Sequence, residues 1–119
     1  MTSRAGWFAA VVCTVSASMA AGPPRLHAEE PTVVKVTIRD HRFSPSTIRV
    51  PAGKPASLEV TNEDDTAEEF DSPALKIEKV IPGGRKGVVR LRPLEPGEYP
   101  FSGEYHADTA KGTVVAVME

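Results

Sequence analysis

The sequence predicts an all-β domain, a Greek-key β-sandwich, preceded by a cleaved signal peptide. Apolar and polar residues alternate with period two in short runs, which is the pattern of strands with one buried face. Turns rich in proline and glycine separate these runs at intervals of about 10 to 15 residues, a spacing typical of sandwiches. No window shows a convincing helical period, so we expect no long helix in the domain.

The N-terminal segment has the order of regions found in a secretory signal peptide. Arg4 supplies a short positive start, an apolar run covers residues 7–15, and small residues follow. The apolar run is too short to cross a hydrocarbon core of about 30 Å as a permanent anchor. Ser18-Met19-Ala20 fits an A-x-A-like cleavage site, and Leu26-His27-Ala28 is a second candidate. The alternative is a hydrophobic N-terminal helix that stays attached.

We expect residues 1–28 to be the signal peptide and residues 29–119 to be an exported, periplasmic domain. Cys13 is the only cysteine, and it follows Val12, whereas a lipid-attachment cysteine normally follows a small residue. Cleavage therefore leaves neither a disulfide nor a thiolate ligand. The remaining 12 basic and 16 acidic residues give a net charge of −4, which argues against nucleic acid and against an anionic membrane as partners. We expect no membrane insertion after cleavage.

Alternation of apolar and polar residues locates the strands along the domain. In the first of them, three aliphatic residues alternate with polar ones, which gives one buried face. The same pattern recurs between turns rich in proline and glycine. The predicted strands are residues 32–39, 48–50, 57–61, 76–81, 89–92, 99–101 and 112–117, and residues 63–65 are expected to form a solvated acidic turn.

Three stretches of the domain carry a resemblance to a known family. Residues 36–54 are similar to the first two strands of a cupredoxin, residues 60–70 to its first copper-ligand loop, and residues 96–114 to its C-terminal ligand loop. Within the superfamily, the chain resembles most the cupredoxin-like domains of bacterial periplasmic iron-uptake proteins. That resemblance implies a cupredoxin-like domain over residues 29–119 and, as partner, a membrane iron permease or another envelope transport protein. The variants that carry it are Glu68-Glu69-Phe70, Glu78-Lys79-Val80 and Gly103-Glu104-Tyr105-His106.

A blue-copper centre uses two histidines, one cysteine thiolate and usually a weak axial methionine. The resemblance places the first histidine position at Glu68, the cysteine position at Gly103 and the second histidine position at His106. The methionine position falls near Ala110 or Lys111. Because only His106 keeps a ligand residue, we expect no blue-copper electron transfer.

Carboxylates and one imidazole remain around those positions as candidate metal ligands: His106, Glu68, Glu104 and Glu69. Such ligands suit iron, manganese, zinc or cupric ion, and we expect an iron or copper ion. Neighbours on a strand face opposite sides, so only one of Glu68 and Glu69 should enter the site. The alternative is that these are solvated surface charges, with His106 capping its loop. Further candidates to lie nearby are Asp71, Asp108 and His41, the last better suited to packing than to ligation.

These features favour a periplasmic metal-binding protein that serves metal uptake or delivery, and not an enzyme. The sequence has no glycine-rich phosphate loop, no His-Glu-x-x-His run and no nucleophile in a recognisable setting. One alternative is a metal-free interaction module, whose binding would not depend on His106. Another is an oxidase that converts ferrous to ferric ion, although a single mononuclear site without a clear electron acceptor disfavours it.

Overall fold

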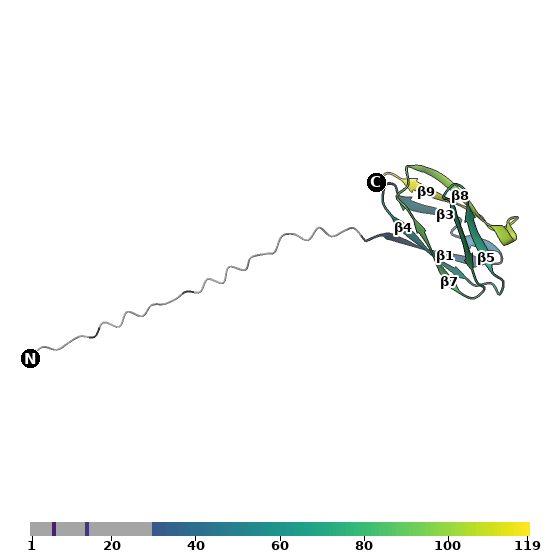
Figure 1. Ribbon diagram of the computed structural model, residues 1–119, viewed down its shortest axis with the longest axis horizontal. Coiled ribbons are helices and arrows are strands. Elements are labelled where there is room, and N and C mark those ends of the chain that lie inside the picture. Colours follow the sequence, from purple (N-terminus) through teal and green to yellow (C-terminus); the bar gives the residue numbers. More distant parts are fainter. Residues whose placement is uncertain (1–5, 7–13, 15–29) are drawn as a thin grey trace, which may run out of the picture.

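A computed structural model describes residues 30–119 of the chain, together with Gly6 and Thr14 (Figure 1). The predicted signal peptide lies almost entirely outside these residues. Within the described part, nine strands and a single 3₁₀ turn, η1, make up the domain. No helix there is long and apolar enough to cross a membrane. The elements are β1 (Thr32–Arg39), β2 (Arg42–Ser44), β3 (Thr47–Pro51), β4 (Ala56–Asn62), β5 (Glu68–Ser72), β6 (Ile77–Ile81), β7 (Lys86–Leu91), β8 (Gly97–Gly103), η1 (Glu104–His106) and β9 (Lys111–Val117).

The strands form two mixed sheets that pack face to face around one hydrophobic core (Figure 1). The four-stranded sheet has the order β2-β1-β4-β7, and the five-stranded sheet has the order β3-β9-β8-β5-β6. The pairs β1–β4 and β3–β9 are parallel, whereas the other neighbours are antiparallel. The predicted all-β sandwich is therefore confirmed.

The core follows the period-two pattern of the sequence. In β4, every second residue is buried, and the residues between them are half-buried. At one end of the core, the ring of Phe101 stacks on Phe70 at a centroid distance of 4.7 Å and meets the edge of Phe43 at 4.9 Å. This aromatic cluster supports the end of the sandwich to which η1 belongs. In Figure 1, that end lies opposite the C-terminus.

Three elements were not predicted as regular structure. We interpreted the residues of β2 as a bend and those of β5 as part of a ligand loop, and η1 was not foreseen. Strand β5 alternates between buried and half-buried positions, but its buried set includes the acidic residue Glu68. A buried carboxylate gives no apolar signal, so periodicity alone could not find this strand. A three-residue turn such as η1 is too short to show any period.

The two-residue turn between β1 and β2 needs support from elsewhere in the chain. Asp40 and His41 both have positive φ, 52° and 57°, as a tight hairpin of this kind requires. Such values strain residues that carry a side chain. The Asp64 carboxylate accepts hydrogen bonds from the N–H groups of Asp40 and His41 at 2.8 and 2.9 Å. Asp64 lies in a half-exposed bend, as expected of a turn residue, and it also holds the β1–β2 turn.

Asp64 is itself held by the buried residue Asn62. The Asn62 side-chain oxygen accepts a hydrogen bond from the Asp64 N–H at 3.0 Å. The Asn62 amide donates to the carbonyls of Thr66 and Ile81 at 2.9 and 3.1 Å. The loop after β4 is thereby tied to β6 and to the β1–β2 turn.

We predict that Asp64→Ala destabilises the domain by about 1 kcal/mol, because two strained N–H groups lose their acceptor in a partly exposed turn. The hydrogen bond from His41 is the main cause that lowers the pKa of Asp64 below its ordinary value of 3.8. The stabilisation should therefore be present above that value and be lost as pH falls through the lowered pKa of the folded state. Urea unfolding across this pH range measures it. Glu63→Ala, at an exposed neighbour, is the control, and equal effects of both changes would contradict the assignment.

Candidate functional site

The positions at which the resemblance placed copper ligands converge at one end of the sandwich. Gly103 ends β8, and its N–H donates to the carbonyl of Ala110 at 2.8 Å. A Cβ atom built on Gly103 would lie 2.5 Å from Cδ of Glu68 and 2.7 Å from Cβ of Ala110. His106 of η1 contacts Glu68 directly. The structure therefore brings Glu68, Gly103, His106 and Ala110 together.

The Glu68 carboxylate fills the space among these residues. Glu68 is only 1% exposed, yet both of its oxygens have partners. One oxygen, Oε1, accepts hydrogen bonds from the N–H groups of Tyr105 at 2.9 Å and Glu69 at 3.0 Å. The other, Oε2, lies 2.6 Å from Nδ1 of His106, and with Glu68 as a carboxylate the donor hydrogen is on Nδ1. A buried carboxylate needs such donors, because an unpaired buried charge is costly.

His41 covers the His106 ring. The two imidazoles stack with their centroids 3.5 Å apart and their planes inclined by 11°. The backbone of His41 is held on both sides, since its N–H donates to Asp64 and its carbonyl accepts a hydrogen bond from the hydroxyl of Thr109 at 2.7 Å. Packing of His41, which we favoured from the sequence, agrees with this geometry.

These residues do not fit a blue-copper centre. The structure has glycine at the cysteine position, and the Glu68 carboxylate occupies the space that a side chain at Gly103 would need. Without a thiolate, the ligand set of a blue-copper centre cannot form. Of the two residues near the methionine position, Ala110 is fully buried and offers no ligand atom, and Lys111 is exposed.

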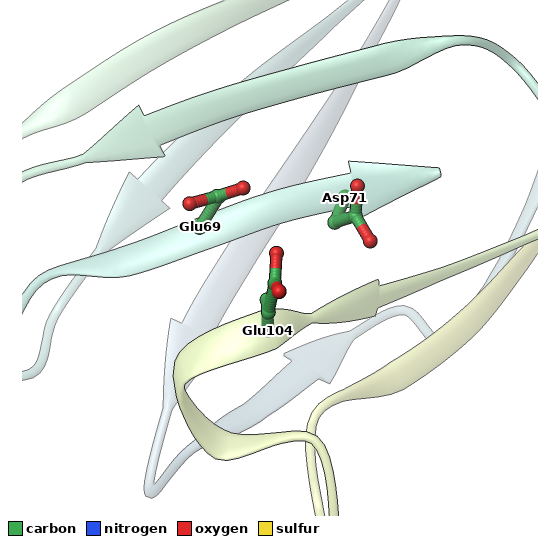
Figure 2. Close-up of side chains that lie close together, drawn as sticks. All are labelled: Glu69, Asp71 and Glu104. Carbon is green, nitrogen blue, oxygen red and sulfur yellow. The ribbon is translucent and has the colours of Figure 1, made fainter. Parts of the chain in front are cut away.

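A second group of carboxylates lies on the outer face of the five-stranded sheet. Glu69 and Asp71 are two residues apart in β5, so their side chains share the face opposite to Glu68. Figure 2 shows Glu104 pointing from η1 toward both of them. Ligand oxygens of Glu69, Asp71 and Glu104 all lie within 4.8 Å of one another, a set that we call the acidic cluster.

Crowding of negative charge changes the protonation of the acidic cluster. The pKa of Glu104 is raised above its ordinary value of 4.5, first by a hydrogen bond with Glu69 and then by the charges of Glu69 and Asp71. Glu78 of β6 adds a smaller repulsion. The pKa of Tyr105 is also raised, first by desolvation and then by the charge of Glu69. A proton is thus held among these carboxylates more tightly than on an isolated side chain.

The four candidate ligands therefore divide between two faces of β5. Glu68 and His106 contact each other inside, whereas Glu69 and Glu104 belong to the acidic cluster outside. Glu68 is buried and Glu69 is half-buried, so these neighbours face opposite sides of β5, and the expectation that only one of them enters a metal site stays a prediction. Asp71, which we expected only as a neighbour, belongs to the cluster, and its i, i+2 spacing from Glu69 was a signal that could have identified it.

Comparison with known proteins identifies the family. The cupredoxin-like domain family matches residues 6–116, and the chain belongs to it. An uncharacterised protein of Rickettsia prowazekii (strain Madrid E), RP394, is 42% identical over 82 residues, which cover 69% of this chain and 66% of that protein. The match thus spans just under two thirds of that relative's length.

Solved structures with low sequence identity share the fold. Auracyanin A, a blue copper protein of Chloroflexus aurantiacus, matches with a TM-score of 0.61 and 14% identity, covering 74% of this chain and all of that one. The periplasmic domain of cytochrome oxidase subunit II (CoxB) of Bradyrhizobium japonicum matches with a TM-score of 0.61 and 16% identity, covering 74% of this chain and 85% of that one. At these identities the likeness concerns the fold alone.

We predict that Gly103→Ala destabilises the domain by about 1–3 kcal/mol, because the new methyl group overlaps the Glu68 carboxylate. The backbone of Gly103 has φ −89° and ψ 105°, which alanine adopts without strain, so the cost comes from packing. Thermal or urea unfolding of Gly103→Ala, Glu68→Ala and the double variant gives the coupling. The methyl group should cost less when Glu68 is already alanine. Strictly additive effects would show that the two side chains do not compete for space.

Proposed function

We propose that this chain is a periplasmic metal-binding protein that serves metal uptake or delivery and is not a blue-copper electron carrier. The observation that carries the proposal is the acidic cluster, which places three carboxylates within 4.8 Å of one another. The structural neighbour auracyanin A is described as a copper protein, so this fold is one on which metal sites are built. Because fold does not determine function, the residues of the cluster have to support the proposal.

Electrostatics favours a cation among these side chains. Neighbouring carboxylates repel one another unless a proton or another cation lies between them. The raised pKa of Glu104 reflects this repulsion, because the hydrogen bond with Glu69 and the neighbouring charges favour its protonated form. A divalent or trivalent ion would neutralise more of this charge than a proton does. Oxygen ligands favour hard ions such as iron, and cupric ion should also bind because affinity rises along the divalent series to copper.

The alternative is that Glu68 and His106 bind the ion themselves. If Nδ1 and Oε2 were the ligand atoms, their contact at 2.6 Å would have to open, because each atom is the hydrogen-bonding partner of the other. Two backbone N–H groups also hold the second oxygen of Glu68. The acidic cluster needs no such rearrangement, since its oxygens are half-buried or exposed on the sheet surface. We therefore place the ion at Glu69, Asp71 and Glu104.

The proposed location and partner rest on the sequence. The expected signal peptide over residues 1–28 would direct the domain to the periplasm, and the CoxB neighbour is itself a periplasmic domain. The resemblance to iron-uptake proteins supports a membrane iron permease or another envelope transport protein as the recipient of the ion. A carrier of this kind requires no catalytic step, and an exposed cluster allows the ion to enter and leave.

We predict that the protein without its signal peptide binds about one equivalent of Mn²⁺ or Cu²⁺, and about one equivalent of Fe²⁺ when oxygen is excluded. The substitutions Glu104→Gln and Glu69→Gln should each weaken this binding about tenfold (about 1.4 kcal/mol). Each change removes a charged oxygen ligand while keeping the side-chain shape. Isothermal titration calorimetry measures the affinities. Glu98→Gln is the matched control, because Glu98 is an exposed carboxylate at the other end of β8.

The pH dependence has a defined direction. The pKa of Glu104 is raised, so a proton competes with the ion at a higher pH than for an isolated glutamate. Affinity should therefore fall as pH decreases, beginning above 4.5, and the pH dependence should weaken in Glu104→Gln. If the parent binds none of the three ions more tightly than millimolar, the interaction-module alternative replaces this proposal. If Glu98→Gln weakens binding as much as Glu104→Gln, the ion is bound elsewhere.

A further inference from the structure

We infer that the hydrogen-bonded pair of Glu68 and His106, which we call the latch, links β5 to η1 where a copper ion would otherwise join them. The latch also positions Glu104 at the acidic cluster and does not bind metal itself. The second part rests on the proposed function, because it concerns the same cation site. The first part stands on the metal-free geometry. Both follow from contacts that lie on the inner side of β5.

The latch joins two segments that are far apart in the sequence. A single carboxylate, that of Glu68 in β5, is bonded to the backbone of Tyr105 and to the ring of His106 in η1. The same side chain accepts a third hydrogen bond from its neighbour Glu69. All three partners meet a side chain that is 1% exposed, so water competes poorly for these hydrogen bonds. A metal ion bound at the two histidine positions of the family, which are residues 68 and 106 here, would join the same two segments.

The latch also determines where Glu104 lies. Glu104 directly precedes the two residues that Glu68 holds, and Gly103 before it is paired with Phe70 of β5. The backbone of residue 104 is therefore held on both sides against β5. Glu69 follows Glu68 in the sequence and lies on the outer face of β5, where its side chain is hydrogen-bonded to that of Glu104. Figure 2 shows the Glu104 side chain on the outer face, pointing toward Glu69, while the hydrogen bonds of Glu68 hold η1 from the inner face.

The stacked histidines argue against an ion shared by the imidazoles of His41 and His106. Imidazole lone pairs lie in the ring plane, and the planes of His41 and His106 are inclined by only 11° at 3.5 Å. Two such rings direct their lone pairs along nearly parallel planes and not toward one ion between them. The ring of His106 is instead enclosed between Glu68 and His41, and its side chain is 23% exposed. That arrangement suits a hydrogen-bond donor with a fixed orientation.

The substitution His106→Asn distinguishes a hydrogen-bond donor to Glu68 from a metal ligand. The side-chain N–H₂ group of asparagine occupies nearly the position of Nδ1 of histidine, so His106→Asn keeps a donor for Glu68 but removes the imidazole. His106→Ala removes both. A latch requires the donor, whereas a metal ligand requires the imidazole nitrogen.

Calorimetric titration of these variants with Mn²⁺ gives the decisive comparison. We expect His106→Asn to keep the Mn²⁺ affinity within about threefold of the parent, and His106→Ala to lose about tenfold or more, as for other residues that orient a ligand. Electron spin echo modulation of the Mn²⁺-loaded parent should show no directly bound nitrogen. Equal losses in both variants, or a bound nitrogen that disappears in His106→Asn, would overturn the inference. If His106→Ala does not fold, the asparagine variant and the spin-echo spectrum still decide.

A separate measurement distinguishes failure of the latch from failure of the proposed function. Without metal, hydrogen exchange of the Tyr105 amide reports its bond to Glu68. We expect this exchange to be slow in the parent, nearly as slow in His106→Asn and much faster in His106→Ala. If the parent binds no ion but the exchange follows this order, the proposed function fails and the latch remains. If the amide exchanges equally fast in all three proteins, the latch is disproved whatever the metal binding.

Discussion

The structure depends most on one buried carboxylate. Glu68 lies at a buried position of β5, and a charge in that place is tolerated only with hydrogen-bond donors around it. The donors come from η1 and from the adjacent backbone of β5. Among the residues that the structure describes, no buried side-chain nitrogen or oxygen lacks a partner. The loop between β8 and β9 therefore has to keep a conformation in which Tyr105 and His106 can hydrogen-bond to the Glu68 carboxylate.

Alternation along β5 gives the strand two functions. Its inner residues continue the core and hold η1, whereas its outer residues present carboxylates to solvent. Because Glu68 and Glu69 are neighbours, the inner contact and the outer cluster cannot move independently. The hydrogen bonds of Glu68 to η1 and the carboxylates of the acidic cluster therefore lie on opposite sides of one short strand. This coupling requires only a stiff backbone and the opposite orientation of successive side chains.

The comparison with auracyanin A shows how little of a metal site is contained in a fold. Both chains adopt the same sandwich at 14% identity, yet the blue-copper ligand set is absent here. Gly103 allows the backbone to pass close to the Glu68 carboxylate, and any side chain at that position would collide with it. In this chain the Glu68 carboxylate, bonded to the ring of His106 and to the N–H of Tyr105, links β5 to η1.

The sequence by itself determined the all-β class, most strands of the sandwich and the absence of a blue-copper ligand set, because alternation and residue identity are local properties. If residues 68 and 69 lie in a strand, their adjacency also places them on opposite faces. Periodicity could not show that they do lie in a strand, because the buried face of β5 includes the carboxylate of Glu68. Only the tertiary structure decided that His106 binds Glu68, that His41 stacks on that ring, and that Glu104 joins Glu69 and Asp71. Those contacts join residues that are tens of positions apart, and they depend on strand pairing and on backbone donors such as the N–H of Tyr105, which no side-chain pattern encodes.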